Sequence, residues 1–353
     1  MSSETEPGVT AEPGSVNEPL LDLAALTTWM GAEGHVGSRP LAGARLTSGR
    51  SNAMFRLDDG IHRWVLRRPT AVAVERSDEL MRREFRLLSA LDETDVPHPR
   101  TVALCDDPAI LGCTFYIMEA VDGFNPIGPL PGVLQSHEPD VASAMVDALA
   151  ALHMADWRAL GLEGFGHPEG FHERQVARWT RQLDSYGGRA LPGLERVGRW
   201  LGEHLPGEFE PTIMHGDYHM LNVIVADDLP ARVAAIVDWE TASIGDPLLD
   251  AIGFVEVWCP SHSPEEGWPD REDLLRRYAA TRGIDELGSV DYYAALYHFR
   301  LAVLLEGIYQ RSLVDSTRPP ATDVGERVMI EVELAGAAVD GASPQVRSVE
   351  DSQ

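Results

Sequence analysis

The chain of 353 residues carries 56 acidic and only 29 basic side chains, which gives a formal net charge of −27. Such a charge disfavours binding to nucleic acid or to an anionic membrane surface, and no run of about 18 apolar residues predicts a membrane span. The three cysteines, Cys105, Cys113 and Cys259, form no Cys-x-x-Cys pair. We therefore expect neither a disulfide framework nor a structural zinc site, and a cytoplasmic location fits.

Both ends of the chain are expected to be disordered. Residues 1–18 contain four Glu, no basic residue and an excess of Ser, Pro and Gly, and they lack the basic start and apolar centre of a signal peptide. Apolar periodicity is lost again in residues 341–353. The chain between these tails is long enough for one large or two smaller domains. We divide it into residues 19–118 and 119–340, because a strand ends there at a turn.

The first half predicts a small antiparallel sheet with helices. A helical apolar spacing covers residues 21–34, and three short strands with tight turns follow at 45–48, 53–57 and 64–67, the pattern of a meander. Residues 77–91 form an amphipathic helix by periodicity. Residues 114–118 then predict another strand, which runs into a turn at Asp122 and Gly123.

The second half is predicted to be mostly helical. Helical patterns cover residues 141–157, 173–187, 194–205, 271–282, 290–311 and 323–339. A helical lobe that follows a small sheet indicates an α+β protein with two lobes.

One stretch of the second half, residues 215–250, concentrates oxygen-bearing side chains. Two β-branched apolar runs, 223–226 and 233–237, flank a turn-forming Asp-Asp-Leu-Pro cluster and predict a β-hairpin. Pairing of these strands brings Asn222, at the start of one, next to Asp238, at the end of the other, and Asp217 lies five residues before Asn222. Two carboxylates and an amide oxygen suit Mg²⁺. A loop Asp can also serve as a helix cap or an Asx turn, and for Asp217 alone that reading stays open.

The spacing of Asp217, Asn222 and Asp238 matches the catalytic loop and the later metal-binding Asp of kinases. From residue 19 to 339 the chain resembles the aminoglycoside phosphotransferase and choline kinase superfamily, in which His-Gly-Asp stands where protein kinases have His-Arg-Asp. The run DWETASIGDPLLD looks most like the branch that includes the kinase-like domain of certain acyl-CoA dehydrogenases. The resemblance implies a two-lobed protein-kinase-like fold, with a small antiparallel-sheet N-lobe and a larger, mostly helical C-lobe.

The resemblance also implies a nucleotide site in the first half. Arg67, where the family usually has Lys, would pair with the α and β phosphates, and Glu84 would hold it. On the residues alone, Arg67 could be a surface strand residue and Glu84 a helix-surface partner of exposed arginines. The remaining nucleotide contacts that the resemblance implies are a turn over the phosphates and a strand end beside adenine: Ser48, Gly49, Ser51 and Asn52, then Met118, Glu119 and Val121.

In the second half the resemblance assigns the chemistry. Asp217 would accept or orient the proton of the substrate hydroxyl, while Asn222 and Asp238 would hold Mg²⁺. His215 is expected to brace this loop. Asp246 and Asp250 are expected to cap or tether the helix that begins near Pro247, and His153 is expected to be a packed helix residue.

We therefore predict a kinase that uses ATP, or GTP in its place, with Mg²⁺ to phosphorylate a hydroxyl of a small molecule. The alternatives are a nucleotide-binding pseudokinase or scaffold, and a metal-dependent hydrolase that uses His215, Asp217 and His219. Neither the oligomeric state nor the acceptor, aminoglycoside-like or hydroxyacyl-type, follows from the sequence. The ammonium groups of an aminoglycoside could bind to acidic side chains, for which the candidates are Glu240, Glu256 and Glu306. An acidic acceptor could instead face arginines, for which the candidates are Arg178, Arg181, Arg300 and Arg311.

Overall fold

The computed structural model describes residues 21–37, 39–46, 52–70, 75–258, 262, 264–314 and 319–341. The two predicted tails lie outside these residues, apart from Gly341. The chain divides into two compact units, Met1–Asp122 and Gly123–Gln353, which are called unit 1 and unit 2 below.

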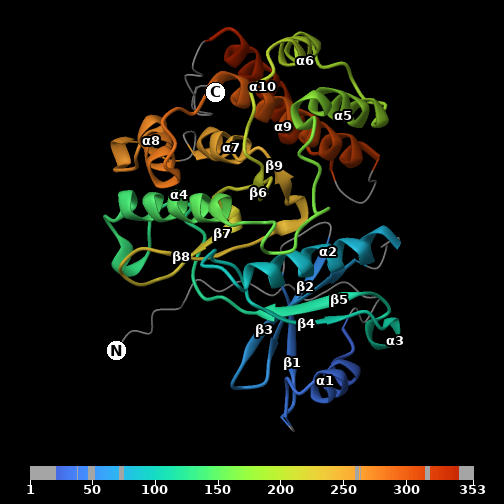
Figure 1. The fold of residues 1–353 in the computed structure, drawn as a ribbon. Helices are drawn as coiled ribbons and strands as arrows, with labels where there is room; N and C mark the ends of the chain where they lie inside the picture. Colours follow the sequence, from blue (N-terminus) through green and yellow to red (C-terminus); the bar gives the residue numbers. More distant parts are fainter. Residues whose placement is uncertain are drawn as a thin grey trace. The chain divides into compact units, whose positions relative to one another are not determined.

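Unit 1 is built on a five-stranded antiparallel sheet with the strand order β1-β2-β3-β5-β4 (Figure 1). The predicted meander is present, with Phe55 opposite Leu66 in its central register. One strand was not expected, because its apolar run is short and follows directly after two prolines. The strands are β1 (Ala42–Leu46), β2 (Asn52–Asp58), β3 (Arg63–Pro69), β4 (Thr101–Cys105) and β5 (Phe115–Glu119), and β4 is the unexpected one.

Helices cover this sheet and close its core. Helix α2 (Glu75–Leu91) runs beside the sheet in Figure 1 and buries Leu87, Leu88 and Leu91. Helix α1 (Leu23–Ala32) contributes apolar side chains such as Leu26 to the core of the sheet. Asp22 caps this helix by accepting hydrogen bonds from two backbone amides at 3.0 Å. A short helix, α3 (Pro108–Leu111), precedes β5.

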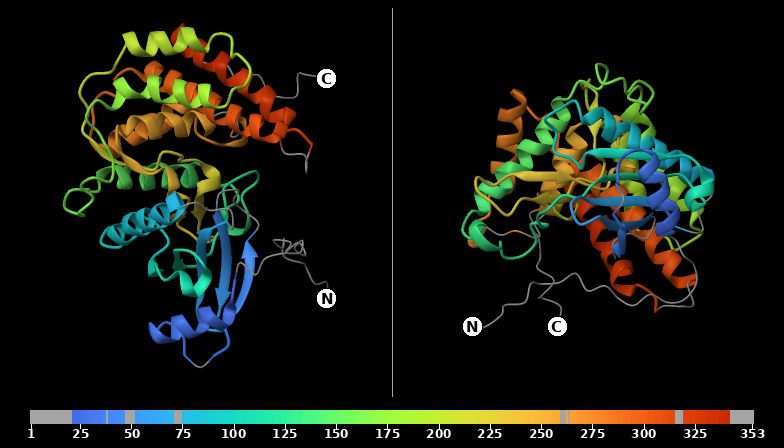
Figure 2. Two further views of the ribbon diagram at one scale, coloured as in Figure 1. Left: turned by 90° about the vertical axis from the view of Figure 1, so that its right-hand side faces the viewer. Right: turned by 90° about the horizontal axis from the view of Figure 1, so that it is seen from below.

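Unit 2 is mostly helical, as predicted. Helices α5, α6, α9 and α10 lie side by side in one view of Figure 2. None of the described helices combines the length and the apolar character that a membrane crossing needs. The helices are α4 (Glu138–Met154), α5 (Phe171–Ser185), α6 (Leu194–Glu203), α7 (Leu248–Trp258), α8 (Arg271–Arg282), α9 (Val290–Val314) and α10 (Thr322–Val339), with 3₁₀ turns at Gly132–Leu134, Met220–Asn222, Trp239–Thr241 and Pro264–Glu266.

Unit 2 also contains two small two-stranded sheets. The predicted hairpin is β7 (Val223–Val225) paired with β8 (Val233–Ile236). A second pair, β6 (Thr212–Met214) with β9 (Ser243–Gly245), was not predicted, because the two short strands are far apart in sequence and no tight turn indicates their pairing. The second pair brackets the hairpin in sequence, so together the two sheets fix both chain segments that carry the candidate site.

Candidate functional site

The β7–β8 hairpin brings the predicted oxygen ligands to one end. Val223 pairs with Ile236, and the Val237 amide donates to the Asn222 carbonyl at 2.9 Å. Asn222 directly precedes β7, and Asp238 follows the end of β8. Because the two strands pair, both residues lie at the same end of the hairpin. Asp238 has φ 67° and ψ 65°, a left-handed conformation that Asp tolerates better than most residues. The chain turns sharply there into the Trp239–Thr241 3₁₀ turn.

Asp217 and Asn222 are in direct contact. The Asn222 amide nitrogen donates to the Asp217 carbonyl at 2.9 Å and to its carboxylate Oδ2 at 3.2 Å. The Asn222 amide oxygen accepts no hydrogen bond from the described residues. The side chain of Asp217 is 52% exposed, whereas Asn222 is 7% exposed. The loop thus buries the amide and leaves the carboxylate accessible.

The charge of Asp217 is set by its neighbours. Burial works to raise the pKa of the Asp217 carboxyl, but the hydrogen bond and charge of His219, together with His215 and Arg300, outweigh it and hold the pKa below its usual range. The His219 ring nitrogen Nε2 lies 3.4 Å from Asp217 Oδ2. Asp217 is therefore ionised at neutral pH, the state that a proton acceptor needs.

His215 joins the two segments of the site. Its side chain is fully buried; Nδ1 accepts from the Asp217 amide at 3.3 Å and Nε2 donates to the Val237 carbonyl at 3.0 Å. One acceptor and one donor define a neutral imidazole, and burial lowers the pKa of His215 accordingly. The expected brace is present. Because both ring nitrogens are used, a zinc pair with His219 is not supported, and the described residues offer no group of three His, Cys, Asp or Glu that could hold a metal.

Asp250 holds the backbone of the same loop, a role that the sequence did not reveal. Its two carboxylate oxygens accept from the His215 amide at 2.6 Å and the Gly216 amide at 2.9 Å. His153 packs behind it, with Nε2 3.5 Å from Oδ2, and is buried in helix α4 as predicted. Asp246, in contrast, caps α7 as expected by accepting from the Leu248 amide at 3.0 Å.

Gly216 is required where it stands. It has φ +82°, and a Cβ there would lie 2.7 Å from the Thr241 carbonyl oxygen, so a larger residue meets both backbone strain and a clash. The Gly216 carbonyl accepts from Arg300 Nη2 at 3.3 Å. Helix α9 thereby reaches the loop that carries Asp217.

In unit 1 the expected ion pair between Arg67 and Glu84 is present. Both side chains are buried, at 6% and 2% exposure; Arg67 Nη2 donates to Glu84 Oε1 at 3.1 Å, and Nε lies 2.8 Å from Oε2. The Tyr116 hydroxyl donates to Glu84 Oε2 at 2.9 Å. A surface position for Arg67 is therefore excluded. Burial of two charges is tolerated only when they are paired and hydrogen-bonded in this way.

The other predicted nucleotide residues of unit 1 are only partly described. Asn52 begins β2 opposite Pro69, while Ser48, Gly49 and Ser51 lie outside the described residues. Met118 is buried in β5, and the Glu119 amide donates to the Arg100 carbonyl at 2.9 Å. That bond occupies the Glu119 N–H. Val121 lies beyond the strand, and its backbone makes no hydrogen bond with the described residues.

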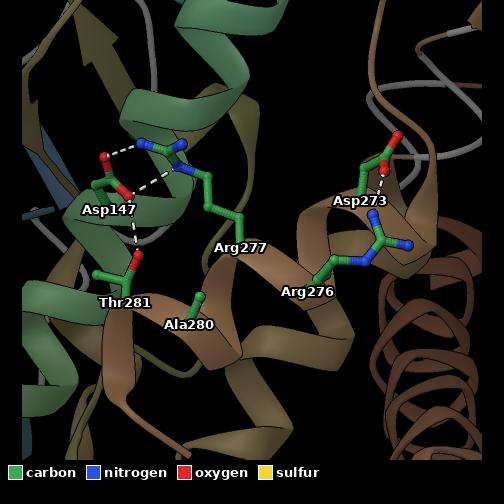
Figure 3. Close-up of a pocket in the computed structure, with 6 residues that line it drawn as sticks. All are labelled: Asp147, Asp273, Arg276, Arg277, Ala280 and Thr281. Atoms are coloured by element: carbon green, nitrogen blue, oxygen red, sulfur yellow. Dashed lines mark hydrogen bonds and ion pairs between the residues drawn. The ribbon is translucent and has the colours of Figure 1, made fainter.

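A surface hollow between α4 and α8 contains none of the predicted site residues (Figure 3). Asp147 accepts from Arg277 at 2.9 and 2.5 Å and from the Thr281 hydroxyl at 3.3 Å. Arg276 pairs with Asp273 at 2.6 Å. Because these charges neutralise one another, the hollow offers a ligand no unpaired group, and we do not regard it as the functional site.

The sequence comparisons fit this geometry. Residues 43–287 match the model of the phosphotransferase enzyme family. The chain belongs to this family. It is 32% identical over 310 residues to mouse acyl-CoA dehydrogenase family member 10, covering 84% of this chain and 29% of that protein, and 32% identical over 285 residues to human acyl-CoA dehydrogenase family member 11, covering 77% and 36%. It thus spans about a third of the length of these relatives.

Solved structures confirm the kinase-like fold. A Ralstonia eutropha protein, provisionally described as an aminoglycoside phosphotransferase, has a TM-score of 0.80 at 29% identity, with 92% of this chain and 99% of that chain covered. The macrolide 2′-phosphotransferase of Brachybacterium faecium has a TM-score of 0.59 at 20% identity, with 92% and 100% covered. At that identity the second likeness shows the fold alone. The predicted α+β, two-lobed class and the predicted resemblance are both confirmed.

Proposed function

We propose that this phosphotransferase-family protein transfers the γ-phosphoryl group of ATP, or of GTP in its place, to a hydroxyl of a small molecule. The observation that carries the proposal is the arrangement at the end of the β7–β8 hairpin. There an accessible, ionised Asp217, a buried Asn222 whose amide oxygen has no hydrogen-bond partner among the described residues, and Asp238 follow the order and spacing of a phosphoryl-transfer loop.

Each residue receives a role from its surroundings. Asp217 accepts or orients the proton of the attacking hydroxyl, because its carboxylate is ionised and half-exposed. The donor set of Asn222 and Asp238 fits Mg²⁺, which takes few protein oxygens and completes its shell with water and phosphate. When bound, this ion would neutralise charge on the nucleotide phosphates. Asp250 and His215 keep the loop in place through its backbone.

In unit 1 we assign the α and β phosphates of the nucleotide to Arg67. Glu84 and Tyr116 fix the guanidinium in one orientation, so no side-chain freedom remains to be lost on binding. Asn52 with Ser48, Gly49 and Ser51 would cover the phosphates, and Met118, Glu119 and Val121 would flank the base.

The test is phosphoryl transfer from γ-labelled ATP to a panel of neutral, cationic and anionic alcohols. We expect labelled product with the wild type in Mg²⁺ and none after chelation. Asp238→Asn keeps the left-handed backbone but weakens the metal site, so it should raise the Mg²⁺ requirement. Asp228→Asn, the same change in the turn at the other end of the hairpin, should not. Nucleotide binding without transfer to any acceptor would identify a pseudokinase or scaffold and overturn the proposal.

A further inference from the structure

The acidic and basic side chains of unit 2 that are candidates for binding the acceptor differ in whether their charges are already neutralised. Glu256 and Glu306, which could have received ammonium groups of a cationic acceptor, are 7% and 0% exposed. Glu256 pairs with Arg271 at 2.7 Å and Glu306 with Arg189 at 3.2 Å. Both carboxylates are thus committed inside unit 2. They offer no binding site to a polycation.

Arg300 shows the opposite behaviour. It forms no ion pair with a carboxylate of the described residues; Nη2 donates only to the neutral Gly216 carbonyl at 3.3 Å, and Nε is buried without a hydrogen-bond partner. A guanidinium nitrogen that is buried without a partner is costly, and arginine cannot give up its proton to avoid that cost. The group therefore retains hydrogen-bonding capacity immediately beside the residue that precedes Asp217.

Two further groups gather around Arg300. The Arg300 guanidinium lies 5.4 Å from the ring centre of Trp179, and that of Arg178 lies 5.0 Å from the same ring, so one aromatic ring has two cations close to it. Tyr297 stands one turn before Arg300 on the same face of α9. The Tyr297 hydroxyl makes no hydrogen bond with the described residues. Two cations and a hydroxyl donor therefore stand close together. Among the described residues none of the three forms an ion pair or hydrogen bond with a carboxylate, although Asp217 and Asp250 act on Arg300 electrostatically.

We infer that Arg300, with Arg178 and Tyr297, forms an anion subsite for the acceptor, which then carries a carboxylate or phosphate close to the hydroxyl that Asp217 serves. This inference rests on the proposed function. Arg300 would bind the anion through its fork of donors, Tyr297 would add a hydroxyl donor, and the Trp179 ring would pack against the carbon chain. Such a subsite also offsets the repulsion between an anionic acceptor and the Asp217 carboxylate.

The experiment compares matched acceptors that differ only in charge. The pairs are 3-hydroxybutyrate with its methyl ester and glycerol 3-phosphate with glycerol, and kanamycin serves as the cation. We expect the wild type to prefer one anionic member over its neutral counterpart, and which pair responds distinguishes a carboxylate from a phosphate. Arg300→Gln should raise KM for that anion about 10- to 100-fold more than KM for the neutral member, the loss expected for a charge-assisted contact. Arg300→Lys should recover part of the loss.

The control is Arg311→Gln, which removes the same charge three turns further along α9, about 16 Å away. It should leave both members unchanged. A wild-type preference for the neutral alcohol or for kanamycin would overturn the inference. So would an equal loss on both members in Arg300→Gln, because that result would mean that Arg300 only supports the Gly216 carbonyl.

A binding measurement separates this inference from the proposed function. The tryptophan emission of the wild type, minus that of Trp179→Phe, is followed as 3-hydroxybutyrate or glycerol 3-phosphate is added. A saturable change that Arg300→Gln abolishes supports the anion subsite even if no acceptor is phosphorylated, in which case the proposed function alone fails. No saturable change with either anion overturns the subsite even if phosphoryl transfer is found.

Discussion

The two units hold their candidate residues by different means. In unit 1, the candidate phosphate-binding cation Arg67 is held by a partner side chain, in the buried pair with Glu84. In unit 2, the Asp250 carboxylate fixes the loop by accepting hydrogen bonds from two backbone amides of the loop. The Asp217 side chain stays half-exposed. A residue that must keep its charge in one place can be locked by a partner charge. A residue that must exchange a proton with a substrate has to be positioned while its carboxylate remains accessible.

The strongest effect is expected for the buried Arg67–Glu84 pair, the side-chain lock of unit 1. Glu84→Ala removes the buried carboxylate that pairs with the Arg67 guanidinium, and we expect a loss of about 3–5 kcal/mol in the free energy of unfolding. Denaturant titration measures it. Glu79→Ala is the matched control, because Glu79 lies on the same helix but its side chain is 75% exposed. Its contact with Arg82, at 3.7 Å, is longer than the contacts of the buried pair. Equal losses in both variants would show that the buried pair contributes nothing special.

The second-largest effect is expected for the contacts of Asp250 with the loop amides, the backbone lock of unit 2. Asp250→Ala leaves the His215 and Gly216 amides without an acceptor, and each unsatisfied group costs about 1–3 kcal/mol. We also expect kcat to fall, because Asp217 is no longer positioned. Asp250→Asn retains one acceptor oxygen and should lie between the wild type and the alanine variant in both measurements. If it equals the wild type in both, the paired amide contacts do not position the loop.

A smaller effect is expected from a buried histidine of unit 2 that takes part in neither arrangement. His298 lies between Glu331, at 2.6 Å, and Glu256, at 3.2 Å, while Arg327 and Arg271 pair with the outer oxygens of these glutamates. Burial works to lower the pKa of His298, but the two glutamates outweigh it and raise the pKa. The charged imidazolium therefore stabilises the folded state.

The sign of the pH dependence follows from that raised pKa. The stabilisation is complete below the unfolded pKa of about 6.5 and is lost as the pH rises through the folded value. Between the unfolded and the folded pKa of His298, we expect the melting temperature of the wild type to decline with pH more steeply than that of His298→Gln. Parallel pH profiles of the two proteins would contradict the assignment.

Much of the frame could be predicted from the sequence, because local patterns determine it. The β7–β8 hairpin followed from two apolar runs around a turn cluster, and it alone places Asn222 beside the end of β8. Strand β4 and the β6–β9 pair were not predicted, since their strands are short and, unlike β7 and β8, none of them is joined to its partner by a tight turn.

The supporting contacts of the site could not be predicted by pattern. Asp250 lies 35 and 34 residues from the amides that it binds, and Arg300 is 84 residues from Gly216. Such contacts depend on how the helices pack, which spacing along the chain does not encode. The Arg67–Glu84 pair could be predicted only from the family resemblance, because periodicity equally allowed an exposed glutamate on α2.

The account depends most on Asp217, whose carboxylate stays accessible while Asp250 holds the backbone of its loop. The decisive measurement is kcat for transfer from γ-labelled ATP to an accepted alcohol, in the wild type and in Asp217→Asn, with nucleotide affinity measured in parallel. We predict that kcat falls about 10²- to 10⁴-fold while nucleotide affinity stays within a factor of about 2. Undiminished turnover in Asp217→Asn would contradict the assignment of this loop as the centre of phosphoryl transfer.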